Sequence, residues 1–396
     1  MYTMFDTVTQ SRRRFLQVSG VALLAGCLPG CGSDINHAIR FGPTIDWGRD
    51  RIAEHMRRNP NAATVSIALL YEGDVVWQEA FGLAAVQDAR PTTVDTRFSI
   101  ASVSKVLAGL AGAILQDMGV LDLDRPVAQY LPGFYMLSPS YTEITSRHLL
   151  SHTSGLPGSN DRNALSFVPI PGFAEDTEAG FSHYHLKHAP GQLAVYCNDG
   201  FTLFERVVLA VSGLSYPEFI RKHILEPLGM SQSGFLVETE NGGDFAFPYL
   251  DGKQYGLMYP QIYASGGLYT TPGDMMKLAQ MLIDRGKFEG RRIVSEAGIA
   301  EVTSDQTGDT TINPSPESLW GLGWDSVRQL SMDAAGFRAW QKNGATAFFQ
   351  TDFLVLPEAR MALLITGSTG YEPTEIVEGV LLRALQDAGL MHAVPS

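Results

Sequence analysis

Strand patterns lie near both ends of this chain, and helical patterns lie between them. Residues 65–69 and 75–79 alternate in hydrophobicity around the turn signal Glu72-Gly73-Asp74, which predicts a β-hairpin. Residues 347–356 and 361–366 predict a second pair of strands joined by a short turn. We therefore expect one sheet that is assembled from both ends of the sequence, with the intervening segment inserted into it.

The middle of the chain carries the helical signals. Apolar residues from 106 to 115 keep a period of 3.6 and cover almost the whole circumference of the predicted helix, which is typical of a buried helix. Other helical patterns occupy 45–56, 203–211, 274–285 and 376–385. The expected fold class is α/β (α+β): an antiparallel sheet flanked by helices, with a large helix-rich lobe inserted over about residues 100–335.

Composition excludes several classes of function. The formal net charge is −13 and the chain has only seven lysines, so we expect no nucleic-acid partner. Three cysteines form no disulfide framework, and no zinc pattern occurs. No phosphate or dinucleotide loop follows any strand, so we expect neither a cofactor nor a metal. No feature points to a protein partner.

The first 33 residues resemble an export signal with a flexible leader. Residues 11–16, Ser-Arg-Arg-Arg-Phe-Leu, precede an apolar run at 18–24 that is too short to span a bilayer. The arginines resemble the twin-arginine class of signals. Leu24-Ala25-Gly26-Cys27 resembles a lipobox, which predicts a lipid anchor at Cys27; the alternative is a plain cleavable signal. We expect an exported protein of the periplasm or cell envelope, which contacts the membrane only through Cys27.

Ser102 and Lys105 begin the apolar central helix. Residues three apart are neighbours on one helix face, so the hydroxyl and the amine are within reach of one another. A serine hydroxyl needs a base to become a nucleophile, and a lysine in an apolar site has a lowered pKa that suits this task. The helix N-terminus adds positive charge where an oxyanion develops. By itself the spacing is a weak signal, because it arises by chance about once or twice in a chain of this length.

Two further motifs follow in order, and with them the chain resembles the superfamily of serine β-lactamases and penicillin-binding proteins. Tyr196-Cys197-Asn198 resembles the Tyr-x-Asn element of class C β-lactamases and related esterases and peptidases, and Lys342-Asn343-Gly344 resembles the Lys-Thr-Gly element. Each pattern occurs once. The resemblance covers about residues 45–390 and includes the flanking segments 98–101, 149–156, 190–191, 227–230, 264–268 and 320–324.

The resemblance implies a role for each motif residue. Ser102 is the expected nucleophile, Lys105 its base and Tyr196 the proton shuttle to the leaving group. Asn198 is expected to donate a hydrogen bond to the substrate, and Lys342 to supply positive charge. Asn343 and Gly344, which complete the Lys-Asn-Gly motif, are expected to bind the substrate as well. The backbone amides of Ser102 and Ala345 are the expected oxyanion hole. The implied partner is a small-molecule or peptide acyl substrate, bound without any cofactor.

One motif position departs from the family pattern. Asn343 replaces a threonine or serine that helps to hold the substrate carboxylate of β-lactams and D-alanyl peptides. Phe348 and Phe349 follow where many relatives carry glycines, which predicts a narrower and more apolar mouth. Both changes favour neutral esters or amides. Because the glutamate motif of class A enzymes is absent, deacylation is expected to run through Tyr196 and Lys105.

Three histidines, His183, His185 and His188, cluster without sharing one helix face, so we interpret them as solvated rather than metal-binding. His152 is interpreted as a packing or capping residue. The functional hypotheses are a class C-like hydrolase of esters, amides or β-lactams; a carboxypeptidase acting on D-alanyl peptides; and a penicillin-binding sensor or scaffold that is acylated once without turnover.

Overall fold

The computed structural model of the chain describes residues 39–240, 242–308, 319–368 and 373–391. The predicted signal segment, including Cys27, lies outside the described residues. Within the described ranges, no helix combines the length and the apolar run that a membrane crossing requires.

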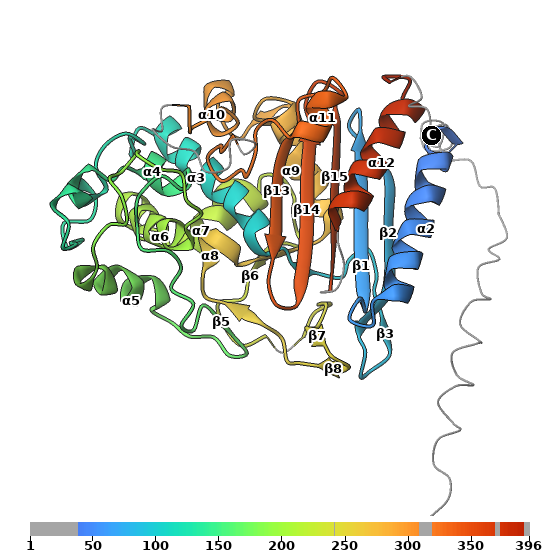
Figure 1. Cartoon of the computed structure of the whole chain (residues 1–396), viewed down its shortest axis with the longest axis horizontal. Helices are drawn as coiled ribbons and strands as arrows, with labels where there is room; N and C mark the ends of the chain where they lie inside the picture. The colour runs from blue at the N-terminus through green and yellow to red at the C-terminus, as the bar shows by residue number, and fades with distance from the viewer. Residues whose placement is uncertain (1–38, 241, 309–318, 369–372, 392–396) are drawn as a thin grey trace, which may run out of the picture.

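A six-stranded antiparallel sheet joins the two ends of the chain. Its order is β13-β14-β15-β1-β2-β3, and the first strand pairs with the last, with Val65 opposite Gly367. The strands are β1 (Thr64–Tyr71), β2 (Asp74–Ala85), β3 (Arg90–Pro91), β13 (Trp340–Ala345), β14 (Phe349–Leu356) and β15 (Met361–Ser368). This confirms the expected fold class, in which both chain ends build one sheet (Figure 1).

Helices cover both faces of this sheet. Alternate residues of β15 enter different cores: Leu363 and Ile365 pack with α2 (Gly42–Arg58) and α12 (Pro373–Asp387), whereas Leu364 packs with the helical lobe. Figure 1 shows α2 and α12 side by side against the sheet. Burial on both faces explains why β15 is apolar along most of its length.

The inserted lobe is organised around α3 (Lys105–Asp117). Residues 105–115 of this helix are all buried, as its apolar circumference predicts. Its other helices are α4 (Ser146–Leu150), α5 (Phe173–Gly180), α6 (Asn198–Ser212), α7 (Tyr216–Ile220), α8 (Tyr263–Gly266), α9 (Pro272–Ile283) and α10 (Glu296–Val302). Between the lobe and β13 lies α11 (Leu330–Ala334).

The short strands of the lobe are β4 (Phe98–Ser99), β5 (Leu165–Ser166), β6 (Gly234–Phe235), β7 (Tyr249–Leu250), β8 (Lys253–Gln254), β9 (Tyr259–Pro260), β10 (Leu268–Thr270), β11 (Lys287–Phe288) and β12 (Arg291–Arg292).

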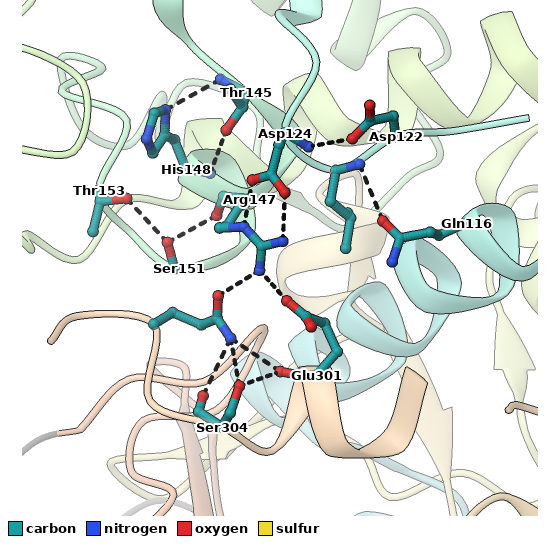
Figure 2. A network of polar contacts seen from close by, with 12 residues as sticks. Gln116, Asp122, Asp124, Thr145, Arg147, His148, Ser151, Thr153, Glu301 and Ser304 are labelled. Carbon is teal, nitrogen blue, oxygen red and sulfur yellow. Dashed lines mark hydrogen bonds and ion pairs between the residues drawn. The ribbon is translucent and has the colours of Figure 1, made fainter. Parts of the chain in front are cut away.

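Arg147 of α4 lies at the centre of a polar network that joins distant parts of the lobe (Figure 2). Its Nε and Nη2 donate to the two carboxylate oxygens of Asp124 at 2.6 and 2.8 Å. Its Nη1 donates to Glu301, which belongs to α10, and to Gln306 at 2.7 Å. Thr145 caps the same helix. The network fixes the base of the loop that follows α4, and that loop carries His152.

We expect Gly109→Ala to destabilise the fold. A Cβ at Gly109 would lie 2.1 Å from the carbonyl oxygen of Leu322, so α3 and the segment before β13 must separate. The expected loss is about 1–3 kcal/mol in the free energy of unfolding, measured by urea titration. Gly180→Ala is the control, because a Cβ there meets nothing within 4 Å. Equal stability of the two variants would contradict the close contact.

Candidate active site

Ser102 and Lys105 are brought together at the start of α3. Ser102 lies in a 3₁₀ turn, Ala101–Ser104, and the α-helix begins only at Lys105, which differs from the expected single helix. Residues three apart eclipse one another in a 3₁₀ turn, which brings these two side chains together. The Lys105 Nζ donates to the Ser102 Oγ at 3.0 Å. The preceding residue, Ala101, has a φ of 47°, a strained value that positions the turn.

Tyr196 completes the set around the nucleophile. Its hydroxyl donates to the Ser102 Oγ at 2.7 Å, and the Lys105 Nζ lies 4.9 Å from its ring centroid. Burial acts to raise the pKa of Tyr196, but the positive charges of Lys105 and Lys342 outweigh this effect and lower it. The Ser102 hydroxyl therefore lies beside Lys105 and Tyr196, whose pKa values are both lowered. Each group loses its proton more readily than usual and can then accept one from Ser102.

His152 positions Tyr196 from behind. The imidazole stacks on the phenol ring with centroids 4.4 Å apart and planes at 21°. The Cys197 N–H donates to its Nδ1 at 2.9 Å, which assigns the ring proton to Nε2. Burial, together with the charges of Lys105 and Lys342, holds the pKa of His152 well below its usual range. A neutral ring packed under Tyr196 agrees with the packing role expected for this histidine.

Lys105 makes a second contact deep in the lobe. Its Nζ donates to the carbonyl oxygen of Ser265 in α8 at 2.7 Å. Burial is the main cause that lowers the pKa of Lys105, and the charge of Lys342 lowers it further, while Tyr196 and Asp325 act in the opposite direction. A lysine in this environment releases its proton more readily than an exposed one, as a general base requires.

Glu205 of α6 fixes α8, and sequence reasoning missed it. Its Oε1 accepts the Ala264 N–H at 2.8 Å, so this carboxyl holds the short helix whose Ser265 carbonyl contacts Lys105. Burial raises the pKa of Glu205 to about 8. The local signal was one acidic residue among the apolar residues of α6, where a charge needs a partner.

Lys342 is also buried, but it is paired. Its Nζ lies 2.7 Å from the Asp325 Oδ2, which also accepts the Asn343 N–H at 3.1 Å. Burial acts to lower the pKa of Lys342, but Asp325 and then Tyr196 outweigh it, so the pKa is raised and the lysine stays charged. Asp325 was not predicted from the sequence, although it directly follows the Trp-Gly-Leu-Gly-Trp segment at 320–324, which resembles the family.

Gly344 allows the edge strand β13 to reach the nucleophile. A Cβ at this position would lie 2.3 Å from the Ile100 carbonyl oxygen and 2.9 Å from the Ser102 nitrogen. Only glycine permits this approach, and it brings Ala345 beside Ser102. Both residues line a cleft of about 270 Å³, whose other walls are Ala101, Asp161, Ala164, Leu165, Asn198, Ile262, Ser265, Gly266 and Thr346.

Asn198 is the first residue of α6 and lines this cleft. Its Nδ2 donates to the Ser159 Oγ at 3.0 Å, and its buried Oδ1 has no hydrogen-bond partner among the described residues. The amide nitrogen carries a second N–H, which leaves a donor for the substrate contact expected from the resemblance.

The two phenylalanines after β13 differ in position. Phe348 is half-buried. Phe349 is fully buried and packs edge-on against Phe98 with centroids 6.3 Å apart, so the expectation that it narrows the mouth is wrong. Phe348 lies in the turn before β14, whereas Phe349 is the first residue of that strand and belongs to a buried cluster. Asn343 is exposed.

The histidine cluster is held by local contacts. The His185 Nδ1 lies 3.2 Å from the Ser138 Oγ, and the His188 Nδ1 lies 2.9 Å from the Ala189 carbonyl oxygen. In the part of the chain that the structure describes, no three His, Cys, Asp or Glu residues are grouped as metal ligands would be.

Comparisons with known proteins agree with this geometry. A family model described as Beta-lactamase matches residues 49–387. A β-lactamase of Yersinia enterocolitica is 23% identical over 343 residues, covering 78% of this chain and 82% of that protein. The D-alanyl-D-alanine-carboxypeptidase/endopeptidase AmpH of Escherichia coli (strain K12) is 27% identical, covering 59% of this chain and 61%, less than two thirds, of that protein.

Among solved structures, the octameric penicillin-binding protein homologue from Pyrococcus abyssi superposes with a TM-score of 0.68 at 26% identity, covering 86% of this chain and 77% of that one. The family model spans both the sheet and the helical lobe, and it includes all three motifs. The chain therefore belongs to the β-lactamase family of serine hydrolases, which also includes penicillin-binding proteins.

Proposed function

We propose that this protein is an exported serine hydrolase that forms an acyl-enzyme on Ser102 and cleaves esters or amides whose leaving group is uncharged. The observation that carries the proposal is the position of the Ser102 Oγ, 3.0 Å from the Lys105 Nζ and 2.7 Å from the Tyr196 hydroxyl. A hydroxyl between two such groups has a path for its proton in each direction.

In acylation, neutral Lys105 takes the Ser102 proton as the Oγ–carbonyl carbon bond forms. The Ser102 and Ala345 amides stabilise the oxyanion. The bond to the leaving group then breaks, and Tyr196 delivers a proton to it and is reprotonated from Lys105. In deacylation, a water gives one proton to the same pair and attacks the acyl carbon. The bond from the acyl carbon to the Ser102 Oγ breaks, the proton returns to this oxygen, and the free acid leaves.

The charges at the leaving-group side support an uncharged leaving group. Lys342 is already neutralised by Asp325, whose other oxygen, Oδ1, is buried without a hydrogen-bond partner among the described residues. A substrate carboxylate near Lys342 would therefore find this ammonium already paired with a carboxylate. Asn343 also lacks the hydroxyl that binds such a group in related enzymes.

Two alternatives share the same site. A carboxypeptidase acting on D-alanyl peptides is supported by the name of the Escherichia coli relative, and the arrangement around Lys342 disfavours it because such peptides end in a carboxylate. A sensor that is acylated once requires slow deacylation, and Tyr196 and Lys105 supply the groups for turnover. β-Lactam cleavage belongs to the class C-like hydrolase hypothesis. The arrangement around Lys342 also disfavours it, because β-lactams carry a carboxylate on the leaving-group side.

Export and anchoring belong to the same proposal. Residues 1–33 carry the twin-arginine-like signal and the lipobox-like Leu24-Ala25-Gly26-Cys27, which support an acylated Cys27 on the cell-envelope side. The site would then act on substrates of that compartment.

We expect Ser102→Ala to abolish hydrolysis of a nitrophenyl ester, lowering kcat/KM by roughly 10³-fold or more, because no other group replaces the nucleophile. The measurement uses protein lacking residues 1–33 and follows both nitrophenol release and intact mass. Ser182→Ala, which removes a hydroxyl bonded only to its own helix end, is the matched control. Equal activity of parent and Ser102→Ala would disprove the assignment, and acylation without turnover would favour the sensor.

We expect Lys342→Met to move the rising limb of kcat/KM against pH to higher pH. The base must be unprotonated, and the charge of Lys342 lowers the pKa of both Lys105 and Tyr196, so its removal raises both pKa values. Lys222→Met, an exposed lysine outside the site, is the control. If the rising limb of kcat/KM against pH is unchanged in a variant whose fold is verified by circular dichroism, Lys342 does not lower the pKa of the base.

We expect Asp325→Asn to weaken discrimination against carboxylates. The measurement compares two ester substrates with the same acyl group. In one, the leaving alcohol carries a free carboxylate; in the other, that carboxylate is masked as a methyl ester. The preference for the neutral ester should fall about tenfold, which corresponds to about 1.4 kcal/mol. Asp95→Asn, at an exposed position, is the control. If the parent favours the carboxylate ester, or turns over D-alanyl peptides faster than either ester, the carboxypeptidase hypothesis is correct.

A further inference from the structure

Three aromatic rings from three separate segments meet beside the cleft. They are Phe167 after β5, Tyr255 after β8, and Phe348 in the turn between β13 and β14, and we call them the aromatic rim. The Phe167 and Tyr255 rings stack with centroids 5.9 Å apart, Tyr255 and Phe348 lie 5.2 Å apart, and Phe167 and Phe348 lie 6.1 Å apart in an edge-on arrangement.

The aromatic rim is continuous with the cleft that contains Ser102. Leu165, two residues before Phe167, and Thr346, two residues before Phe348, both line that cleft. The Thr346 Oγ1 accepts the Phe348 N–H at 3.1 Å, which fixes the turn next to the end of β13. An apolar surface therefore extends from the cleft wall to the rim.

Phe167 is the exposed ring of the rim, whereas Tyr255 and Phe348 are half-buried. Phe167 is 47% exposed and the neighbouring Leu165 is 40% exposed, while Phe349, one residue after Phe348, is fully buried. Contiguous exposed apolar side chains beside a cleft are unusual in soluble proteins and mark a binding surface.

The direction of the substrate follows from the proton path of the proposed function. The proposed function places the leaving group on the side of Lys342, whose Nζ lies 5.5 Å from the ring centroid of the proton donor Tyr196. Ala345, whose backbone amide is the expected oxyanion donor, lies three residues after Lys342 at the end of β13. The acyl group must then continue past Thr346, which is toward the aromatic rim.

We propose that the aromatic rim binds an apolar acyl chain of the substrate, so that the protein prefers esters or amides of medium-length hydrocarbon or aryl acids. This inference rests on the proposed function and adds the acyl specificity. A competing surface is a cavity of about 720 Å³ that shares Asp161 with the cleft and is lined by Asp176 and Asp199. That cavity suits a cationic acyl group, and the aromatic rim is favoured because the exposed side chains at its edge, Leu165 and Phe167, are apolar.

The test compares nitrophenyl acetate, butyrate, hexanoate and octanoate, which share one leaving group, with a nitrophenyl ester of an amino-alkanoic acid. In the parent, kcat/KM should rise with chain length by up to about fourfold for each buried methylene. Phe167→Ala and Phe348→Ala should flatten this rise while acetate hydrolysis stays within about twofold. Tyr135→Ala, which removes another exposed aromatic ring outside the cleft, should retain the rise.

Four results would overturn the inference. A chain-length dependence that survives in both rim variants, or an equal loss of acetate and octanoate hydrolysis, would show that the rim is structural. A preference for the cationic ester would assign the acyl group to the acidic cavity. A change from dimer to monomer in the rim variants, measured by light scattering, would show that a second copy covers the rim. Failure of the proposed function is distinct, because the parent would then hydrolyse none of the esters.

Discussion

The site depends on one buried ammonium, that of Lys105. Its Nζ contacts the Ser102 hydroxyl and the Ser265 carbonyl, so a single group connects the nucleophile turn to α8. Burying a charge is costly unless it is paired or loses its proton. Among the described residues its hydrogen-bond partners are the uncharged oxygens of Ser102 and Ser265, and a lysine without a paired carboxylate suits the base role proposed for it.

Lys342 has the same degree of burial and the opposite role, because Asp325 lies beside it. One lysine is pushed toward neutrality and the other is held as a cation, and Tyr196 lies between the two charges. The chemistry therefore depends on the asymmetry of their partners rather than on the lysines alone. Separating the pKa values of similar groups by their surroundings is how one site obtains both a base and a fixed charge.

The sequence predicted the sheet and the motif residues because both are local patterns. Alternation over five residues, or a serine three residues before a lysine, is visible without the fold. Asp325 and Glu205 were different, since the partners that define their roles lie 17 and 59 residues away in the chain. The start of α3 was misplaced for a related reason. The 3₁₀ turn at Ser102 is set by the close approach of Gly344, which is a contact between distant segments.

Alternation along β13 explains how specificity changes without loss of the catalytic frame. Lys342 and Gly344 are buried, whereas Asn343 and Ala345 are exposed. The buried pair holds Asp325 and the nucleophile turn, so substitution there disturbs the whole site. Position 343 is exposed, and its printed hydrogen bonds use the backbone. We therefore expect the threonine-to-asparagine difference from the family pattern at this position to act on substrate selection, because Ser102, Lys105 and Tyr196 are held by other residues.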